Sequence, residues 1–351
     1  MTPREGPARE SSDGMAILVT GGLGYIGSHA SVELLRSGFH VAILDNLSNS
    51  KRSVVDRIGE LGRARVDLFV GDLRDSAVLD RIFGERGIEA VVHFAGLKAV
   101  AESVRDPLRY FTNNVGGALS LLEAMRRHGV RKIIFSSSAT VYGLASTLPV
   151  KEGHPLQAVS PYGRTKQFIE RILQDVAAAD PGFRFAILRY FNPVGAHPSG
   201  RLGEDTAGVP ENLMPHICRV AAGRAEKLWV FGDDYGTPDG TCIRDYIHVM
   251  DLAAGHLCAL DYLGKHDRSI TVNLGTGRGY SVLEVVRAFE RANGVTVPYE
   301  IAPRRPGDIP RSFADASLAA QTLDWRATRT LEEMCHDAWR WQAANPNGYQ
   351  D

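Results

Sequence analysis

The sequence predicts an α/β fold in which a doubly wound parallel sheet (Rossmann) is joined to a smaller C-terminal substrate-binding lobe. From Met15 onward, short apolar runs rich in β-branched residues alternate with amphipathic helical patterns, and this alternation is typical of a parallel sheet. The first apolar run leads directly into a glycine-rich turn. After Asn192 the periodic pattern gives way to a Gly- and Pro-rich stretch, which indicates passage into a second lobe.

The first lobe is predicted to contain six strands. Six short runs are almost continuously apolar, as strands covered by helices on both faces should be: they are MAILVT, HVAILD, VDLFVGD, AVVHFAG, KIIFSSS and FAILRYFN. The helical patterns between them include HASVELLRSG, which ends at Gly38, and GGALSLLEAMRRHG, which ends at Gly129. A glycine at that place is typical of a helix C-cap.

The second lobe is predicted to be less regular than the first. Strands are expected in KLWVFG and SITVNLG, and helices in VMDLAAGHLCALDYL, in SVLEVVRAFERANG and over about 331–343. The 351 residues exceed the roughly 250–300 at which a single core stops growing. We therefore expect a first domain over 15–192, joined by part of 241–275, and a second lobe over 193–345.

Composition argues against several classes of function. The net charge of −1 gives no basic excess for a nucleic-acid partner, and no apolar run reaches the ~20 residues of a membrane span. The four cysteines are scattered, as is typical of free thiols in a reducing, cytoplasmic compartment. No metal site is expected, because the eleven histidines form no H-E-x-x-H and no Cys/His cluster. Residues 1–14 are polar, lack the apolar centre of a secretory signal and are expected to form a disordered leader.

The turn TGGLGYIGSHA carries Gly21, Gly24 and Gly27, which are spaced three residues apart. Glycines there permit a tight turn and let the main chain approach a pyrophosphate, which then lies at the amino end of the following helix. A glycine triplet alone is weak evidence, but this one follows a strand and opens a helix in the first βα turn. The context therefore favours dinucleotide binding over a merely structural turn.

Asp45 ends the second predicted strand, 18 residues beyond Gly27. An acid at that place accepts hydrogen bonds from the adenosine ribose hydroxyls and repels a 2′-phosphate. NAD is therefore favoured over NADP, although Lys51 and Arg52 nearby are able to pair with such a phosphate.

The segment SPYGRTK carries a phenol, Tyr162, and an ammonium, Lys166. Ser160 and Pro161 suit the N-cap and the first position of a helix. Steps of four and three residues from Tyr162 reach Lys166 and then Ile169, Leu173 and Val176, so the phenol and the ammonium share the apolar stripe of this helix. One interpretation is a lysine that extends to solvent beside a half-buried tyrosine. The other is a general base, whose pKa a nearby ammonium and a nicotinamide ring would lower.

A serine at the end of KIIFSSS would complete such a site, since strand ends at the carboxyl edge are where open α/β sheets bind ligands. Its hydroxyl could hydrogen-bond a substrate oxygen or the phenol. Ser136, Ser137 and Ser138 are equally available by composition, and periodicity does not choose among them.

The second lobe contains further polar segments, namely Tyr190-Phe191-Asn192, Asn212-Leu213, Arg244 and Arg304-Arg305. Two arginines from separate segments could clamp a diphosphate, and Trp229 or Phe231 could line a base pocket. From the residues alone, a solvated surface or a core aromatic is the simpler interpretation.

Seven motifs in order, from about Met15 to Asp351, closely resemble the UDP-glucose 4-epimerases, a family of extended short-chain dehydrogenase/reductases. These motifs are TGGLGYIG, LDNLSNS, FAGLKAV, FSSSATVYG, SPYGRTK, RYFNPVGAHPSG and RDYIHVMD. They extend beyond the generic reductase signature, and the resemblance is therefore specific.

The resemblance implies which residues form the site. The catalytic residues would be Tyr162, Lys166 and Ser138. Besides these three, NAD contacts are implied for Gly21, Gly24, Tyr25, Ile26, Gly27, Asp45, Asn46, Asn49, Ser50, Asp72, Leu73, Phe94, Ala95, Gly96, Lys98, Asn113 and Phe191. Ser138 and Tyr162 would also contact the UDP-sugar, together with Asn192, Asn212, Leu213, Trp229, Val230, Phe231, Arg244, Arg305, Asp308 and Ser312.

The resemblance also implies a reaction. Tyr162 would take the proton of the sugar 4-hydroxyl while the C4 hydride passes to NAD, and the 4-keto sugar would turn and take the hydride back on its other face. UDP-galactose and UDP-glucose would be interconverted by a homodimer. The alternatives are a nucleotide-sugar 4,6-dehydratase, whose relatives carry an Asp-Glu pair where Ala139-Thr140 stand here, and a non-catalytic NAD-sensing regulator, which would tend to lose the Tyr/Lys pair.

Ser312 occupies a place where the family carries either a bulky Tyr or a small residue. The small version is associated with room for a 2-acetamido group. We therefore expect UDP-GlcNAc and UDP-GalNAc to be interconverted as well.

Overall fold

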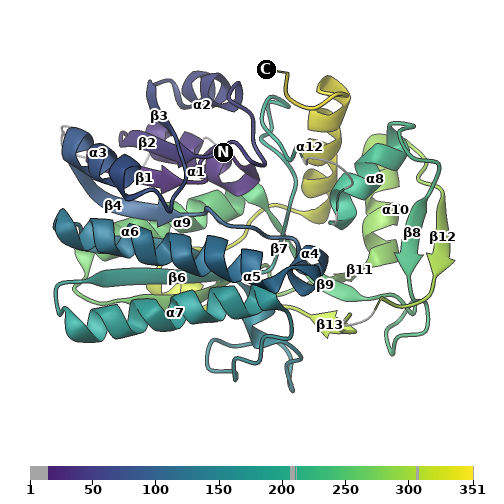
Figure 1. Ribbon diagram of the computed structural model, residues 1–351. Coiled ribbons are helices and arrows are strands. Elements are labelled where there is room, and N and C mark those ends of the chain that lie inside the picture. Colours follow the sequence, from purple (N-terminus) through teal and green to yellow (C-terminus); the bar gives the residue numbers. More distant parts are fainter. Residues whose placement is uncertain (1–14, 206–209, 211, 306–307, 351) are drawn as a thin grey trace.

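The structure is a computed structural model that describes residues 15–205, 210, 212–305 and 308–350 (Figure 1). The leader expected over 1–14 lies outside the described residues. Among those described, a seven-stranded parallel sheet has the order β10-β6-β5-β4-β1-β2-β3. Its strands are β1 (Ala16–Thr20), β2 (His40–Asp45), β3 (Val66–Val70), β4 (Ile88–His93), β5 (Lys132–Ser138), β6 (Arg184–Tyr190) and β10 (Ile270–Leu274).

The predicted doubly wound sheet is confirmed. The six apolar runs of the first lobe form β1 to β6, and SITVNLG supplies β10, which pairs with β6 at the edge. The order reverses between β1 and β4, so the carboxyl ends of these two strands flank the opening of a ligand crevice.

Helices cover both faces of this sheet (Figure 1). One apolar core lies between the sheet and α1 (Tyr25–Arg36), α2 (Val54–Gly62), α9 (Val249–Lys265) and α11 (Ser317–Thr322). The opposite core packs α3 (Ser76–Arg86), α6 (Gly116–Arg127) and α7 (Pro161–Ala179) against the other face. The short helices α4 (Val100–Arg105) and α5 (Pro107–Tyr110) lead through a π-helical turn, Phe111–Val115, into α6.

Two predicted glycine caps lie just beyond helix ends. Gly38 has a φ of +85° after α1, and Gly129 has a φ of +71° after α6. A side chain at either position would be strained, because L-residues rarely adopt a left-handed backbone.

The second lobe contains two small sheets. In one, β9 (Ile243–His248) pairs with β7 (Asn192–Val194), β11 (Gly279–Ser281) and β13 (Arg311–Ser312), and in the other β8 (Leu228–Phe231) pairs with β12 (Tyr299–Ala302). Helices α8 (Leu213–Ala221), α10 (Val282–Asn293) and α12 (Leu331–Ala344) share a third apolar core with these strands. The final helix expected over 331–343 is therefore present.

Candidate active site

A large cleft opens at the carboxyl ends of the parallel strands and contains about 2150 Å³ of empty space, including its open mouth. Eighteen of the residues that the resemblance assigns to NAD or catalysis line it: Gly21, Gly24, Tyr25, Ile26, Gly27, Asp45, Asn46, Asn49, Ser50, Asp72, Leu73, Phe94, Ala95, Gly96, Lys98, Asn113, Tyr162 and Lys166. Asn212 reaches it from the second lobe. The sheet edge thus gathers residues that are far apart in the sequence.

The glycine turn forms a cradle that a side chain would fill. A Cβ at Gly27 would lie 2.3 Å from the Gly21 carbonyl oxygen, and one at Gly21, where φ is +68°, would lie 2.8 Å from the amide nitrogen of Ala95. No side chain caps the amino end of α1, which begins after Gly24. The main-chain N–H groups there suit an anion such as a pyrophosphate.

Asp45 is buried at the end of β2 and is held by the main chain of the turns around it. One carboxylate oxygen accepts from the Leu23 amide at 3.0 Å, and the other accepts from the Leu47 amide at 3.0 Å and the Ser50 hydroxyl at 2.7 Å. An ionised carboxylate has about four acceptor positions. One position therefore stays available to a ribose hydroxyl.

The three serines that the sequence could not separate have different partners. Ser136 Oγ lies 2.8 Å from His256 Nε2, and Ser137 Oγ donates to Glu170 Oε1 at 2.5 Å. Ser138 Oγ accepts from the Thr140 amide at 3.2 Å and from the Thr140 hydroxyl at 3.0 Å, and it is the serine whose side chain lowers the pKa of the Tyr162 phenol. Ser138 is thus the serine that joins the Tyr162 site.

Tyr162 and Lys166 both lie on the buried side of α7. Ser160 caps this helix by accepting from the Gly163 amide at 3.1 Å, and Pro161 is its first residue. The ammonium of Lys166 donates to the Ser136 carbonyl oxygen at 2.7 Å, and the residue is only 5% exposed. A lysine that extends to solvent would leave its charged end in water. That interpretation is therefore wrong.

Burial controls the proton affinity of both groups. It raises the pKa of Tyr162 to about 12, against which the hydrogen bond from Ser138 acts. It lowers the pKa of Lys166 to about 8, while the negative charge of Glu170 acts in the opposite direction. The ammonium lies 6.0 Å from the centre of the Tyr162 ring. The protein alone thus does not produce the lowering of the Tyr162 pKa that the sequence suggested, and a bound positive charge beside the phenol is needed.

Glu204 is a cleft residue that the sequence reasoning missed. Its Oε1 accepts from Lys98 Nζ at 2.9 Å and from Asn212 Nδ2 at 3.4 Å. It therefore connects a residue assigned to NAD with one assigned to the UDP-sugar. The pair with Lys98 spans 106 positions, and no local pattern around Glu204 indicates it.

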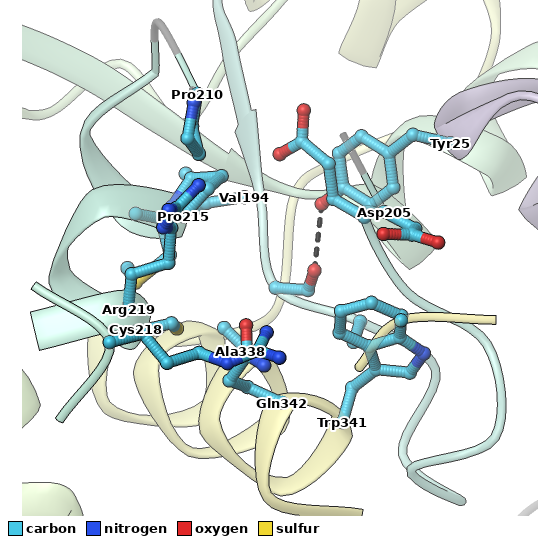
Figure 2. A pocket seen from close by; sticks show the side chains of 16 residues that line it. Tyr25, Val194, Asp205, Pro210, Pro215, Cys218, Arg219, Ala338, Trp341 and Gln342 are labelled. Atoms are coloured by element: carbon cyan, nitrogen blue, oxygen red, sulfur yellow. Dashed lines mark hydrogen bonds between the residues drawn. The ribbon is translucent and has the colours of Figure 1, made fainter. Parts of the chain in front are cut away.

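A smaller cavity adjoins the cleft (Figure 2). Tyr25 separates the two spaces, and its hydroxyl donates to the Gly195 carbonyl oxygen at 2.7 Å. Asp205, on the same side in Figure 2, lines both spaces and accepts from the Tyr349 amide at 2.9 Å. The C-terminal segment thus supports the wall between them.

The residues assigned to the diphosphate gather in the second lobe. The guanidinium of Arg305 stacks 4.6 Å from the centre of the Phe231 ring, and its Nε donates to Asp308 Oδ2 at 3.1 Å. Arg244 donates to the Ile309 carbonyl oxygen at 2.7 Å and lies 4.0 Å from Asp308. Two arginines and an aromatic ring therefore lie together, as a nucleoside diphosphate site requires.

Not every assigned side chain is directed to a ligand. Alternation along β8 directs Val230 into the core and leaves Trp229 exposed, so only the main chain of Val230 is available. Phe191 packs in a separate apolar cluster, whereas its neighbour Tyr190 lines the cleft. Asn192 donates to the Asp245 carbonyl oxygen at 3.0 Å.

Two further residues lie at the edge of the second lobe. Leu213 is the first residue of α8 and packs against the third core. Ser312 is half-buried in β13, paired in register with Arg244 of β9.

Within the residues that the structure describes, no three His, Cys, Asp or Glu side chains are grouped so that they could hold a metal ion. In the same part of the chain, no helix has the length and apolarity that crossing a membrane requires.

Comparison with known proteins identifies the family. The model of the family described as GDP-mannose 4,6 dehydratase matches residues 18–338. The chain is 56% identical over 336 residues to a UDP-glucose 4-epimerase of Bacillus subtilis, covering 96% of this chain and 99% of that protein. It is also 56% identical to one of Yersinia pestis, covering 96% and 100%.

Solved structures agree with this result. The fold matches a UDP-glucose 4-epimerase from Stenotrophomonas maltophila with bound NAD and formylated UDP-arabinopyranose, with a TM-score of 0.93, 52% identity and coverage of 95% and 99%. It matches one from Bifidobacterium longum in complex with NAD+ and UDP, with a TM-score of 0.92, 50% identity and coverage of 95% and 100%. With its glycine cradle and its Ser138–Tyr162–Lys166 arrangement, this chain belongs to the UDP-glucose 4-epimerase family of extended short-chain dehydrogenase/reductases.

Proposed function

We propose that this chain interconverts UDP-galactose and UDP-glucose by transient oxidation at C4 of the hexose, with NAD as its cofactor. The observation that carries the proposal is the burial of the Tyr162 phenol and the Lys166 ammonium side by side in the wall of the cleft, with the Ser138 side chain acting on the phenol. A base, a hydrogen-bonding hydroxyl and a cation thus meet at one point next to a dinucleotide cradle.

The residues present fit NAD. The glycine cradle and the amino end of α1 would hold the pyrophosphate, and the unused acceptor position of Asp45 would hold the adenosine ribose. When bound, NAD supplies a hydride acceptor that also returns the hydride to the same sugar, so that the reaction needs no external oxidant.

Tyr162 takes the proton of the sugar 4-hydroxyl and later returns it. Its phenol needs a nearby positive charge, because burial raises its pKa to about 12. Lys166 places one positive charge nearby, held by its bond to the Ser136 carbonyl, and the nicotinamide ring of NAD would add the second that the phenol needs. Ser138 orients the phenol and can hydrogen-bond the C4 oxygen.

Epimerisation requires the 4-keto sugar to turn over while the nucleotide stays bound. We place the anchors on UDP: Arg244 and Arg305 would clamp the diphosphate, and Phe231 would contact the base. Asp308 contacts both arginines and keeps their side chains in one region of the lobe. The hexose itself would be held by few groups, which allows both faces to be presented to the cofactor.

The two alternative functions are less well supported. A 4,6-dehydratase needs an acid to expel water from C6, but Ala139 and Thr140 stand where its relatives carry Asp-Glu. A non-catalytic NAD sensor would not need the buried ammonium beside a phenol, and burying it costs several kcal/mol.

The test is direct. The purified protein is denatured and its supernatant examined for NAD, and the native protein is incubated with UDP-galactose and followed by NMR. We expect bound NAD and conversion to UDP-glucose without added cofactor. Formation of a 6-deoxy-4-keto sugar, or no reaction with NAD present, would overturn the proposal.

We further propose that N-acetylated UDP-sugars are substrates, as the small side chain of Ser312 suggests. Ser312 pairs in register with Arg244, so it lies beside the proposed diphosphate clamp. A hydroxymethyl group there leaves space that a bulky aromatic would occupy.

We also propose that the protein is a homodimer that works in the cytoplasm. Five large apolar side chains are exposed on helices of the first lobe, on α4, α5, α6 and α7: Val100, Val104, Leu108, Leu119 and Phe168. Helices α4, α5 and α7 contact one another, and exposed apolar groups on such adjoining helices are what an interaction surface would present. The four free cysteines suit a reducing compartment.

A further inference from the structure

A buried polar network lies directly behind the catalytic residues. Glu170 accepts a hydrogen bond from Ser137 Oγ at 2.5 Å. It also accepts three hydrogen bonds from Nε and Nη2 of Arg189, of which the shortest, from Nη2, is 2.7 Å. Glu170 is 1% exposed and Arg189 is 4% exposed. Neither side chain has water as an alternative partner.

The network continues to the edge of the sheet. Arg189 Nη1 donates to the Tyr142 hydroxyl at 3.0 Å, and that hydroxyl donates to Asn273 Oδ1 at 2.6 Å. Asn273 Nδ2 in turn donates to the Val150 carbonyl oxygen at 2.9 Å. Strands β5, β6 and β10 and helix α7 are thereby joined through side chains.

Glu170 holds a particular place relative to the active site. Ser137 immediately precedes Ser138 on β5, and Glu170 lies one helical turn beyond Lys166 on α7. The bond between Ser137 and Glu170 therefore connects the strand that carries Ser138 to the helix that carries Tyr162 and Lys166. Its length sets how closely these elements approach.

Titratable groups surround Lys166 on several elements. Glu170 and Tyr162 lie on the same helix, α7, and His93 of β4 is close enough to sense the ammonium. Arg189 of β6 pairs with Glu170, and His256 of α9 contacts the hydroxyl of Ser136, whose carbonyl oxygen accepts from Lys166. Burial lowers the pKa of His93 to about 3 and that of His256 to about 4, and both are therefore neutral at physiological pH. Among these groups Glu170 is the carboxylate, and its charge raises the pKa of Lys166.

Stability does not explain a pair buried this deeply. Replacing a buried ion pair by apolar residues is often neutral or stabilising, because removing two charges from water is costly. The position of the pair, against the strand end and one turn from Lys166, indicates a role in the reaction.

We propose that Glu170 is a positioning residue for the epimerase reaction: held by Ser137 and Arg189, its carboxylate fixes the strand that carries Ser138 against the helix that carries Tyr162, and it places a negative charge one helical turn from Lys166. The inference rests on the proposed function and concerns changes relative to the wild-type enzyme. If the wild type does not epimerise UDP-galactose, the proposed function fails. If it does and the variants below behave like it, this inference fails alone.

The first test is Glu170→Gln, which keeps the shape of the side chain and removes its charge. In the wild type, kcat should fall at high pH, where Lys166 loses its proton and is no longer an ammonium. We expect the basic limb of the kcat–pH profile to move down by roughly one pH unit, with bound NAD retained. Glu170→Asp keeps the charge and should lower kcat without moving the limb. An unmoved limb in Glu170→Gln overturns the proposal.

Asp251→Asn is the matched control. Asp251 is a buried carboxylate that pairs with Arg329 and accepts from the Thr328 amide, outside the cleft. It should lower the melting temperature and leave the pH profile in place. A shift of the limb in this variant as well would show that loss of stability alone moves it, and would contradict the proposal.

Ser137→Ala decides the question if Glu170→Gln does not fold. It removes one hydroxyl and leaves the ion pair intact. We expect kcat to fall about tenfold, as loss of one hydrogen bond to a charged group implies, with KM for UDP-galactose and the pH profile unchanged. Wild-type kcat in Ser137→Ala would overturn the positioning role.

Discussion

The ammonium of Lys166 donates a 2.7 Å hydrogen bond to the main-chain carbonyl oxygen of Ser136, two residues before Ser138. The nearby ring of Phe135, 4.8 Å from the nitrogen, covers the same group. The positive charge is thus fixed by the strand before any ligand arrives, and it does not reorganise when the phenol loses its proton. Such preorganisation is what makes a buried charge effective in catalysis.

Replacing Tyr162 by phenylalanine should remove the base and preserve the site. The ring would still pack on α7, but nothing else at that point can take the proton of the 4-hydroxyl. We expect kcat to fall by about 10²–10⁴-fold, with NAD still released on denaturation. The measurement is UDP-galactose turnover by NMR at equal enzyme concentration.

Tyr262→Phe is a suitable control for that variant, because Tyr262 lies on α9 against His266 and outside the cleft. It should turn over at the wild-type rate. Turnover by Tyr162→Phe within a factor of a few of the wild type would assign the base to another group.

Activity should decline as the pH rises through about 8. Burial lowers the pKa of Lys166 to about 8, so the side chain is an ammonium below that pH and neutral above it. Burial raises the pKa of Tyr162 even with the ammonium present, and loss of the ammonium would remove a positive charge that favours the phenolate. We expect kcat, measured with saturating UDP-galactose between pH 6 and 10, to decrease on the basic side with a midpoint near that value.

Lys166→Met offers a check on this assignment. It should be weakly active at every pH and should lack the basic limb. A wild-type profile that stays level to pH 10 would show that Lys166 does not control the reaction.

The sequence was informative where function depends on local pattern. The glycine cradle, the cap at Ser160 and the shared stripe of Tyr162 and Lys166 all follow from spacing along one strand or helix, and the structure contains them. The choice among three adjacent serines did not follow, because it depends on partners supplied by α7 and α9.

Other residues could not be found from spacing at all. Glu204 meets Lys98 across 106 positions, and Glu170 meets Arg189 through packing of a helix on a sheet. The directions of Val230 and Phe191 depend on which face of a strand meets the core. Such contacts depend on tertiary structure, and the local periodicity of the sequence does not predict them.

A charged residue on the exposed face of α7 should weaken the dimer. Phe168 is 48% exposed and stacks on Phe111, whose ring centre lies 5.7 Å away. Phe168→Glu would place a charge in the proposed apolar interface, and burying an unpaired charge costs several kcal/mol. We expect sedimentation or light scattering to show a dimer for the wild type and a monomer for this variant at micromolar concentration.

Val70→Glu, on β3 away from those helices, is the matched control, since Val70 is 43% exposed. This variant should remain a dimer of the same mass as the wild type. A wild-type monomer at high concentration would contradict the proposed dimer.

A tyrosine at position 312 should separate the two substrate classes. Ser312 lies in register with Arg244 and is half-buried, so a phenol there would extend from the same strand edge into the space beside the proposed clamp. We expect Ser312→Tyr to reduce turnover of UDP-GlcNAc at least about tenfold relative to UDP-galactose, since a pocket rejects a group for which it has no room. Ser312→Ala, which stays small, should preserve the wild-type ratio of the two activities. Absence of UDP-GalNAc after incubation of the wild type with UDP-GlcNAc would contradict the proposal, and an unchanged ratio in Ser312→Tyr would show that another residue sets this specificity.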